Sequence, residues 1–385
     1  MLNESAEERE AGQRAENAAF MRAMHASRME VEQRTTFEDA AGDYRMEVEA
    51  AGTFDVAAQA GDLHLAATCV GAGLRNLGNT CFVNSLLQAL AHTPPLVNYA
   101  LAGMYEQFEP SSFTFNIGKF IVQARRGAGK VMAPTEIVGS LSTLSKNFKA
   151  GQQEDAQEFF QLVTEKLHTE MLHKMGVKES DEGREKTFIE QVFMGGTRSQ
   201  IVATMSKRTS NVFEQFQFLP VEIQRAGSVQ EALLQFTARE VLEGENRYYC
   251  ESSQRFVRAT KRLTIDTSPN VLVVQLQRSD SGPDGTKNDK FVRYPVELDL
   301  APYMSETQKG VDHHYNLYAV LVHTGPSTRS GHYYIFVRSP AGAWCCMNDS
   351  HVSQESEETV LGQKAYMLFY IRKQPAGGGG AAAAP

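Results

Sequence analysis

The chain has 385 residues, 42% of them hydrophobic, so it can bury a substantial core in one large domain or two ordinary ones. No stretch approaches the about 18 consecutive apolar residues that a membrane span requires, and the N-terminus has no apolar run of signal-peptide type. We therefore expect a soluble intracellular protein, in the cytoplasm, the nucleus or both, without membrane contact.

The net charge of −8 is unevenly distributed along the chain. Residues 1–70 carry 14 acidic and 6 basic side chains, whereas the rest of the chain carries 32 of each. A neutral main domain argues against a general nucleic-acid surface, so we predict no direct nucleic-acid binding. The five cysteines are few, odd in number and irregularly spaced, which favours reduced thiols over a disulfide framework.

Composition divides the chain into three segments. Residues 1–70 are acidic, lack proline and have few large aliphatic residues, which predicts a flexible, partly helical extension. A solvated tail is the simpler account of this extension, and a dedicated docking segment is the alternative. Residues 374–385 form a low-complexity Gly/Ala tail that cannot build a core. Residues 71–373 show helical periodicity first and strand patterns later, which is typical of an α+β domain with segregated layers.

Periodic apolar residues predict the elements of this central segment. A helix is expected over residues 82–90, so that Cys81 opens it, and a second helix over residues 156–167. Three acidic residues gather at the start of the second helix, where the helix dipole favours them: Glu154, Asp155 and Glu158. Strands are predicted at 271–277, 315–323, 332–338 and 365–372. These strands should form an antiparallel sheet that carries His332.

Cys81 is a candidate nucleophile because of its place at a helix start. A free cysteine, with a pKa of about 8.5, needs a helix N-terminus or a neighbouring imidazolium to be largely ionised at neutral pH. Taken alone, a cysteine at the start of an apolar helix is more often a small buried hydrophobic residue. A base is needed to decide between the two interpretations.

His332 is the candidate base. It follows a loop of Gly, Ser and Thr residues at 324–331 and is expected at the first position of a strand. Further along, Asn348 and Asp349 offer two consecutive side chains that can accept from the far ring nitrogen and hold its tautomer. The order Cys, His, Asn/Asp is that of papain-type proteases. Singly, each residue has a simpler account as a turn or strand-entry residue.

Together these segments resemble the ubiquitin-specific proteases. Residues 73–88, GLRNLGNTCFVNSLLQ, resemble that family's cysteine box, and residues 315–370 resemble its histidine box. The segment QQEDAQEFF at 152–160 and the segment at 276–295 match intermediate family segments in the same order. The resemblance covers residues 71–373. It implies an α+β, papain-like cysteine protease fold with a helical thumb, a palm and antiparallel β-rich fingers.

The resemblance implies a deubiquitinating enzyme that hydrolyses the isopeptide bond after the C-terminal glycine of ubiquitin. Cys81 would attack the carbonyl carbon, and His332 would act as base and then protonate the leaving lysine amine. Asn348 matches the usual third triad member, and Asp349 can support or partly replace it. Asn76 matches the family's oxyanion donor, whereas without the resemblance we would interpret it as a turn-capping loop residue.

Binding of ubiquitin's basic C-terminal tail is expected at the start of the second helix. Asp155 and Glu158 match the acidic positions that face the tail and can engage an arginine through bidentate hydrogen bonds. Gln153 and Tyr333 are expected to contact the tail as well. The simpler account of the two acids is favourable charge at a helix N-terminus.

The fingers depart from the family pattern. Many family members bind zinc there with two CxxC pairs, but only Cys250 remains of the four ligands. The other three positions are Met205, Arg208 and Ser253. Because one thiolate cannot hold a structural zinc ion, we expect no metal and no other cofactor.

Ubiquitin and ubiquitinated proteins are the expected partners, and we expect a monomer. Residues 301–305 and 347–350 are similar to a subgroup with nuclear and nucleolar members. One alternative is a catalytically weak ubiquitin-binding module, which the complete triad disfavours. The other is a protease for ordinary peptides or for another ubiquitin-like modifier. The tail-facing acids disfavour ordinary peptides but not every modifier.

Overall fold

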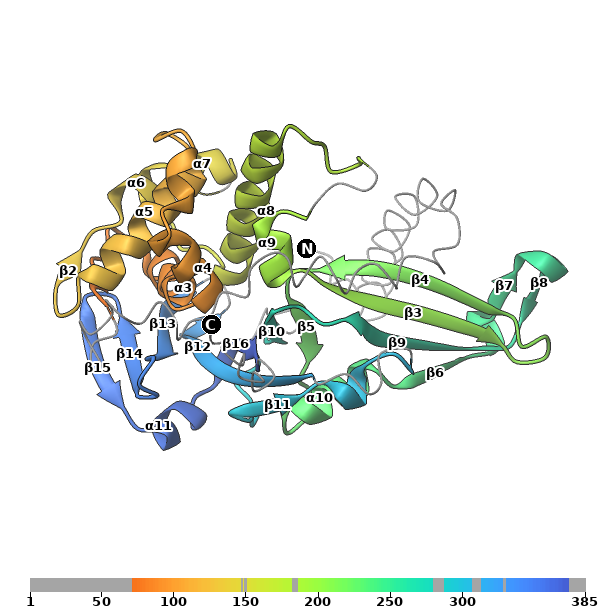
Figure 1. Cartoon of the computed structure of the whole chain (residues 1–385). Coiled ribbons are helices and arrows are strands. Elements are labelled where there is room, and N and C mark those ends of the chain that lie inside the picture. Colours follow the sequence, from red (N-terminus) through yellow and green to blue (C-terminus); the bar gives the residue numbers. More distant parts are fainter. Residues whose placement is uncertain are drawn as a thin grey trace, which may run out of the picture. The chain divides into compact units, whose positions relative to one another are not determined.

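The computed structural model describes residues 71–146, 148, 151–181, 186–279, 287–306, 313–327 and 330–373. The predicted N-terminal extension and the Gly/Ala tail lie outside the described residues. None of the described helices is long and apolar enough to cross a membrane. The described elements form a helical layer, a central sheet and a second, extended sheet (Figure 1).

The helical layer contains the helices that precede the second sheet in the chain. Their bounds are α3 (Cys81–Ala91), α4 (Pro94–Leu101), α5 (Phe113–Arg126), α6 (Thr135–Gly139), α7 (Leu141–Leu144), α8 (Ala156–Met175) and α9 (Phe188–Phe193), with the 3-10 turn η2 (Met104–Gln107). Both predicted helices are confirmed, as α3 and α8. Every residue of α3 is buried, since the helix runs between the central sheet and the other helices.

The central sheet has eight strands, in the order β15-β14-β13-β12-β16-β10-β5, with β11 paired to β12. Their bounds are β5 (Leu219–Glu222), β10 (Val271–Gln277), β11 (Glu297–Asp299), β12 (His314–Ser327), β13 (Ser330–Arg338), β14 (Trp344–Asn348), β15 (His351–Glu355) and β16 (Ala365–Arg372). β5 and β10 are parallel, and the other neighbours are antiparallel. The predicted strands at 271–277 and 365–372 are confirmed with unchanged ends.

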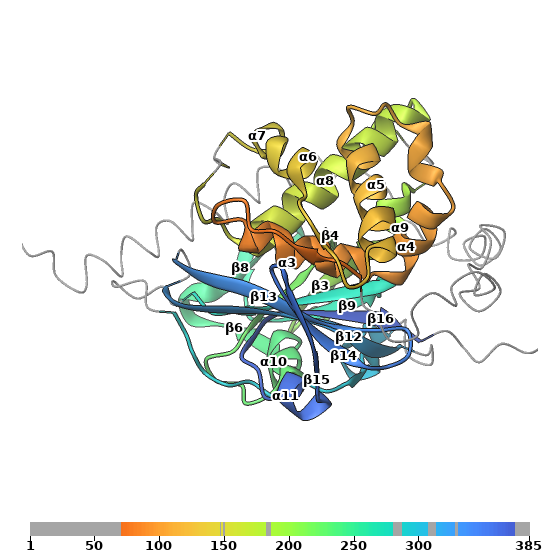
Figure 2. The same ribbon diagram turned by 90° about the vertical axis from the view of Figure 1, so that its left-hand side faces the viewer.

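Both faces of the central sheet are covered. Val271 and Val273 of β10 belong to the apolar cluster on the side of the helical layer. Leu272 and Val274 belong to a second cluster, with residues of α10 (Val229–Phe236) and α11 (Glu357–Leu361). Figure 2 shows α10 and α11 on the side of the sheet opposite the helical layer. A strand that is buried on both faces is a continuous apolar run, which explains the sequence of β10.

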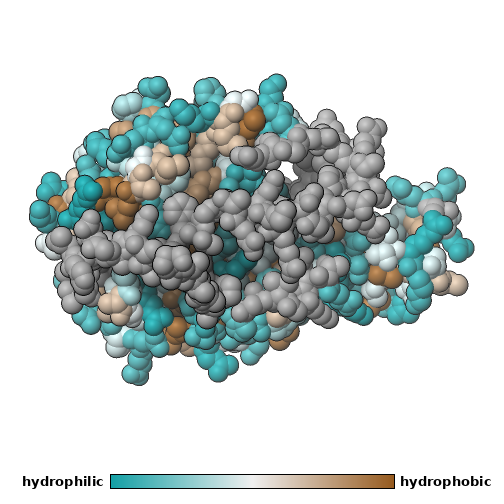
Figure 3. Space-filling model, in the orientation of Figure 1, coloured by the Kyte–Doolittle hydropathy of each residue, from teal (hydrophilic) through white to brown (hydrophobic). Residues whose placement is uncertain are grey.

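The second sheet extends away from the helical layer (Figure 1). Its order is β4-β3-β9-β6, with bounds β3 (Gly195–Ala203), β4 (Thr209–Phe216), β6 (Arg239–Leu242) and β9 (Ala259–Thr267). The hairpin of β7 (Tyr248–Cys250) and β8 (Arg255–Val257) lies near its far end (Figure 1). The surface there is mostly hydrophilic, with isolated hydrophobic residues (Figure 3). The four-stranded sheet and the hairpin correspond to the predicted fingers.

Candidate active site

Cys81 is the first residue of α3, so the helix N-terminus favours negative charge at its side chain. A tight loop connects β1 (Gly73–Leu74) to Cys81, and β1 pairs in parallel with the short strand β2 (Val131–Met132). In that loop Gly78 has a φ of +104°, a conformation that glycine adopts at little cost. The Leu77 backbone N–H donates to Thr80 Oγ1 at 2.9 Å. Cys81 is a free thiol and only 3% exposed.

His332 is held by the paired strands β12 and β13, where it lies opposite Thr324. The expectation of a loop over residues 324–331 was wrong in part, because both strands continue into it. Two glycines make this pairing possible. A Cβ atom on Gly331 would lie 2.2 Å from the Thr324 carbonyl oxygen, and one on Gly325 would lie 2.1 Å from the Ser330 carbonyl oxygen. A side chain at either position would meet the backbone of the other strand, so the close approach of the two strands at this point requires glycine.

Three candidate catalytic side chains meet where α3 faces β13 and β14. His332 Nε2 lies 2.6 Å from Asn348 Oδ1, and because a carbonyl oxygen only accepts, Nε2 must carry the proton. The pKa of His332 is raised to about 9, chiefly by its hydrogen bond with Cys81. Burial opposes this shift, while the bond to Asn348 and the charge of Asp349 add to it. The arrangement can stabilise a thiolate–imidazolium pair.

Asp349 lies beside the triad but binds other side chains. Its carboxylate accepts from Asn76 Nδ2 at 2.9 Å and from Asn84 Nδ2 at 2.8 Å. Asn76 Oδ1 in turn accepts from the backbone N–H groups of Gly78 at 3.0 Å and Thr80 at 3.2 Å. Asn76 is therefore held at both ends of its amide. One of its two N–H donors is used by Asp349, and the other remains for an oxygen at the site.

The two predicted acidic residues have different surroundings. Asp155 is the N-cap of α8 and accepts from the Gln157 backbone N–H at 2.7 Å. The Tyr366 hydroxyl donates to its carboxylate at 2.8 Å. Burial raises the pKa of Asp155, although these hydrogen bonds act in the opposite direction. Glu158, in the first turn of the same helix, is exposed.

Gln153 and Tyr333 both lie at the histidine hairpin. The Gln153 side-chain amide donates to the Gly331 carbonyl at 2.9 Å and accepts from the Gly331 N–H at 3.0 Å. Tyr333 is 4% exposed, and its ring stacks on His323 with centroids 4.3 Å apart. Contact of either side chain with a ubiquitin tail stays a prediction.

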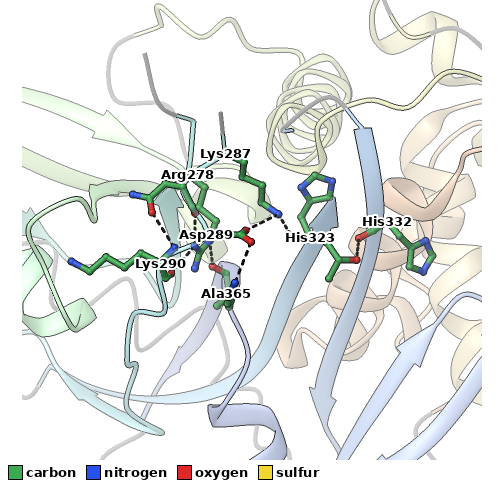
Figure 4. A network of polar contacts seen from close by, with 10 residues as sticks. Arg278, Lys287, Asp289, Lys290, His323, His332 and Ala365 are labelled. Carbon is green, nitrogen blue, oxygen red and sulfur yellow. Dashed lines mark hydrogen bonds and ion pairs between the residues drawn. The ribbon is translucent and has the colours of Figure 1, made fainter. Parts of the chain in front are cut away.

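A buried lysine, which we did not single out in the sequence, supports the other strand of this hairpin. Lys287 Nζ donates to the His323 carbonyl at 2.5 Å, and its side chain is only 5% exposed (Figure 4). Asp289 lies 3.7 Å from the same ammonium group. Nearby, the fully buried Arg278 donates to three backbone carbonyls, those of Ala365, Asn288 and Lys290. These contacts fasten the segment before β11 to the sheet.

Two places deserve consideration as metal sites. At the fingers, Cys250 is buried, while Met205 is 89% exposed and offers no thiolate. Among the described residues, His168, Glu179 and Glu190 also bring possible ligand atoms within 4.8 Å of one another. The His168 ring nitrogens, however, already bond the Thr187 hydroxyl at 2.8 Å and Glu179 at 2.5 Å. That cluster is accounted for as a link between α8 and the capping box of α9.

A cysteine on a helix N-terminus, with a histidine and an asparagine on the facing sheet, is the arrangement of side chains that thiol hydrolases of the papain type share. The sequence pattern of the family "Ubiquitin carboxyl-terminal hydrolase" matches residues 72–370. The chain belongs to this family.

Curated relatives agree with this assignment. The chain is 39% identical to ubiquitin carboxyl-terminal hydrolase 23 of Arabidopsis thaliana, over 79% of this chain and 36% of the relative. It is 40% identical to human ubiquitin carboxyl-terminal hydrolase 42, over 81% of this chain and 24% of the relative. It is 40% identical to human ubiquitin carboxyl-terminal hydrolase 17-like protein 11, over 79% of this chain and 56% of the relative. The chain thus spans less than two thirds of each of these relatives.

Solved structures confirm the fold class. The SAGA Ubp8/Sgf11/Sus1/Sgf73 DUB module bound to ubiquitin aldehyde matches with a TM-score of 0.69 and 27% identity. The match covers 79% of this chain and 70% of that chain. A structure described as yeast SAGA DUBm matches with a TM-score of 0.68 and 29% identity, covering 79% and 69%. The predicted α+β, papain-like protease fold is therefore confirmed.

Proposed function

We propose that this protein is a deubiquitinating enzyme that hydrolyses the isopeptide bond after the C-terminal glycine of ubiquitin. The observation that carries the proposal is the contact of His332 with both Cys81 and Asn348. It is supported by family membership and by a solved relative described as bound to ubiquitin aldehyde. Ubiquitin and ubiquitinated proteins are then the substrates.

Acylation follows from the geometry of the pair. The Cys81 thiolate attacks the carbonyl carbon of the terminal glycine, and a C–S bond forms while the carbonyl oxygen becomes an oxyanion. As this intermediate collapses, His332 gives its proton to the lysine nitrogen, the C–N bond breaks and the amine leaves. Asn348 keeps the His332 ring facing Cys81 throughout, since its Oδ1 accepts from Nε2.

Deacylation uses the same residues in reverse. His332, now neutral, takes a proton from a water molecule that attacks the thioester carbonyl. Collapse of the second intermediate breaks the C–S bond and restores the thiolate–imidazolium pair, and the released carboxyl group of ubiquitin gives its proton to solvent. In both steps Asn76 donates its remaining N–H to the oxyanion, a contribution of about 10²–10³-fold in kcat at such sites.

Substrate choice is assigned to the start of α8. Glu158 is exposed in the first turn of α8, and Asp155 places a carboxylate at the N-cap, so both can meet the basic residues of ubiquitin's tail. Such a contact distinguishes this tail from an ordinary peptide. A ubiquitin-like modifier with a basic tail is the second candidate substrate, favoured by the same two carboxylates.

Hydrolysis of a fluorogenic amide at the C-terminus of ubiquitin tests the proposal. The wild type should cleave it, and Cys81→Ala should lose up to about 10⁶-fold in kcat while still binding ubiquitin. The matched control is Cys345→Ala, since Cys345 is a buried cysteine that forms no disulfide and lies outside the triad. Hydrolysis by Cys81→Ala at a near-wild-type rate would contradict the assignment. Preference for the isolated tail peptide, or for another modifier, would contradict the choice of substrate.

A further inference from the structure

The backbone of Gly331 lacks a regular strand partner. Pairing of β12 with β13 is regular up to Thr324 and His332, and then the register shifts before Ser327 and Ser330. Gly331 lies inside this irregularity, directly before His332. A backbone N–H and C=O without strand partners need other hydrogen-bond partners, because a polar group that is shielded from water and lacks a hydrogen bond costs free energy.

Gln153 supplies both partners. Its carboxamide donates to the Gly331 oxygen at 2.9 Å and accepts from the Gly331 nitrogen at 3.0 Å, as a neighbouring strand would. Gln153 lies two residues before the N-cap of α8, so this contact ties the helical layer to the sheet. The other side of Gly331 is closed by packing, since a Cβ there would lie 2.4 Å from His323 Nε2. Gly331 is therefore held from both sides.

We propose that Gln153 is a positioning residue for His332, which it holds in reach of Cys81 by clamping the backbone of Gly331. The inference rests on the proposed function for its kinetic consequence. It assigns Gln153 a role different from tail binding, since the clamp uses both the oxygen and the nitrogen of the amide. Without the clamp, Gly331 can rotate, and the His332 ring moves relative to the thiol.

The first test needs no ubiquitin. Alkylation of Cys81 by iodoacetamide is measured against pH in the full chain, for the wild type, Gln153→Ala and Gln153→Glu. When His332 faces Cys81, the imidazolium stabilises the thiolate, so alkylation of Cys81 continues at mildly acidic pH. In both variants this stabilisation should be weaker, and the pH below which the alkylation rate falls should be higher than in the wild type. Gln153→Glu can still accept from the Gly331 N–H but cannot donate when ionised, so it should resemble Gln153→Ala.

The second test is kinetic. With a fluorogenic ubiquitin amide, Gln153→Ala should lose about 10- to 100-fold in kcat with KM nearly unchanged, the size expected for a misplaced catalytic group. Gln152→Ala is the matched control, because the neighbouring Gln152 is exposed. Its alkylation profile and kcat should equal those of the wild type.

The outcomes separate the two roles. A raised KM with unchanged kcat and an unchanged alkylation profile would overturn the proposal and make Gln153 a tail-binding residue. If Gln153→Ala unfolds, the isosteric Gln153→Glu provides the same comparison. If the wild type proves inactive on ubiquitin, the proposed function fails, but a shift of the alkylation profile still supports the positioning role. An unshifted profile in folded variants overturns it.

Discussion

Asn348 and Asp349 are consecutive in the chain, yet their side chains bind different parts of the site. Asn348 accepts from His332, whereas Asp349 accepts from Asn76 and Asn84. Asn348 ends β14, and Asp349 follows in a turn with a φ of +50°. This left-handed conformation directs the carboxylate toward the loop that precedes Cys81. In the proposed mechanism, base orientation and oxyanion support therefore fall to neighbouring residues.

We predict that Asn348→Ala loses activity on ubiquitin substantially, on the order of 100-fold in kcat or more, because His332 loses the acceptor that holds its ring. Asp349→Ala should lose less by itself, and the double variant should lose more than either. If Asp349→Ala proves the more damaging change, the roles of the two residues are reversed.

Asp349 and Asn76 should behave as one unit. We expect Asp349→Ala and Asn76→Ala to be non-additive in kcat, because the bond at 2.9 Å joins them and removing either residue impairs the same oxyanion donor. A double-mutant cycle on kcat measures the coupling. Strict additivity would show that Asp349 supports catalysis through His332 alone.

Variants of Asp155 and Glu158 distinguish a charge contact with ubiquitin from a purely structural role in capping α8. We predict that Glu158→Ala raises KM for ubiquitin more at low salt than at high salt, because salt screens charge pairs at the surface. Asp155→Asn should raise KM in the same way and keep the cap, whereas Asp155→Ala should also destabilise the fold by about 0.5–2 kcal/mol. An unchanged KM for Glu158→Ala and Asp155→Asn at low salt would leave only the capping role.

His323 should make the fold sensitive to acid. Burial, followed by the charges of Lys287 and His332, lowers the pKa of His323 to about 4, although Asp289 acts in the opposite direction. In the unfolded chain the pKa is near 6.5, so the native state takes up fewer protons as the pH falls from 6.5 toward 4. The contribution of neutral His323 to folding stability is therefore fully present above pH 6.5 and is lost as the pH falls from 6.5 to about 4.

The variant His323→Phe removes this titration and keeps a ring to stack on Tyr333. Its Tm should fall less between pH 7 and pH 4.5 than that of the wild type. The exposed His173 offers a control, since His173→Gln should leave the wild-type pH dependence intact. Parallel loss of Tm in His323→Phe and the wild type would show that other groups cause the acid sensitivity.

We predict that the fingers contain no zinc. Three of the four family positions lack a thiol, and the sequence has no histidine between His173 and His313. The β7–β8 hairpin has an aromatic pair instead, Tyr249 and Phe256, with centroids 5.3 Å apart. Purified protein should hold far less than one zinc per chain, and a chelator should change neither Tm nor activity.

Stoichiometric zinc that is lost together with activity would contradict this prediction. In that case His168→Gln locates the ion, because it removes the nitrogen ligand of the one candidate cluster found among the described residues. Zinc retained in His168→Gln would then lie in the fingers, and zinc lost from it would lie beside α8.

The sequence was most informative where one pattern decides the structure. The continuous apolar run of β10 indicates a strand that is buried on both faces of a sheet. The helical spacing of apolar residues after Cys81 indicates a helix with a buried face. Segment 324–331 misled us, since glycine is usually a loop residue. Here Gly325 and Gly331 permit a close strand approach that no side chain allows.

Contacts across the fold could not be predicted from the sequence. Gln153 and Gly331 are 178 positions apart, and a glutamine before a helix is ordinarily a surface residue. Lys287, in a segment rich in Gly, Ser and Asp, has the pattern of a solvated loop, yet it is buried against His323. The direction of the Asp349 side chain depends on the positive φ angle of Asp349 in its turn. The sequence shows only that Asn348 and Asp349 are adjacent, so this angle could not be predicted from it.

The central claim is that Cys81 is the nucleophile of a ubiquitin-directed protease, and trapping it tests the claim most directly. Ubiquitin with a C-terminal electrophile is incubated with the protein, and the modified residue is mapped by peptide mass spectrometry. We predict one covalent adduct per chain, on Cys81, that is absent in Cys81→Ala. An adduct on another cysteine, or no adduct with ubiquitin while a ubiquitin-like modifier probe reacts, would contradict the account.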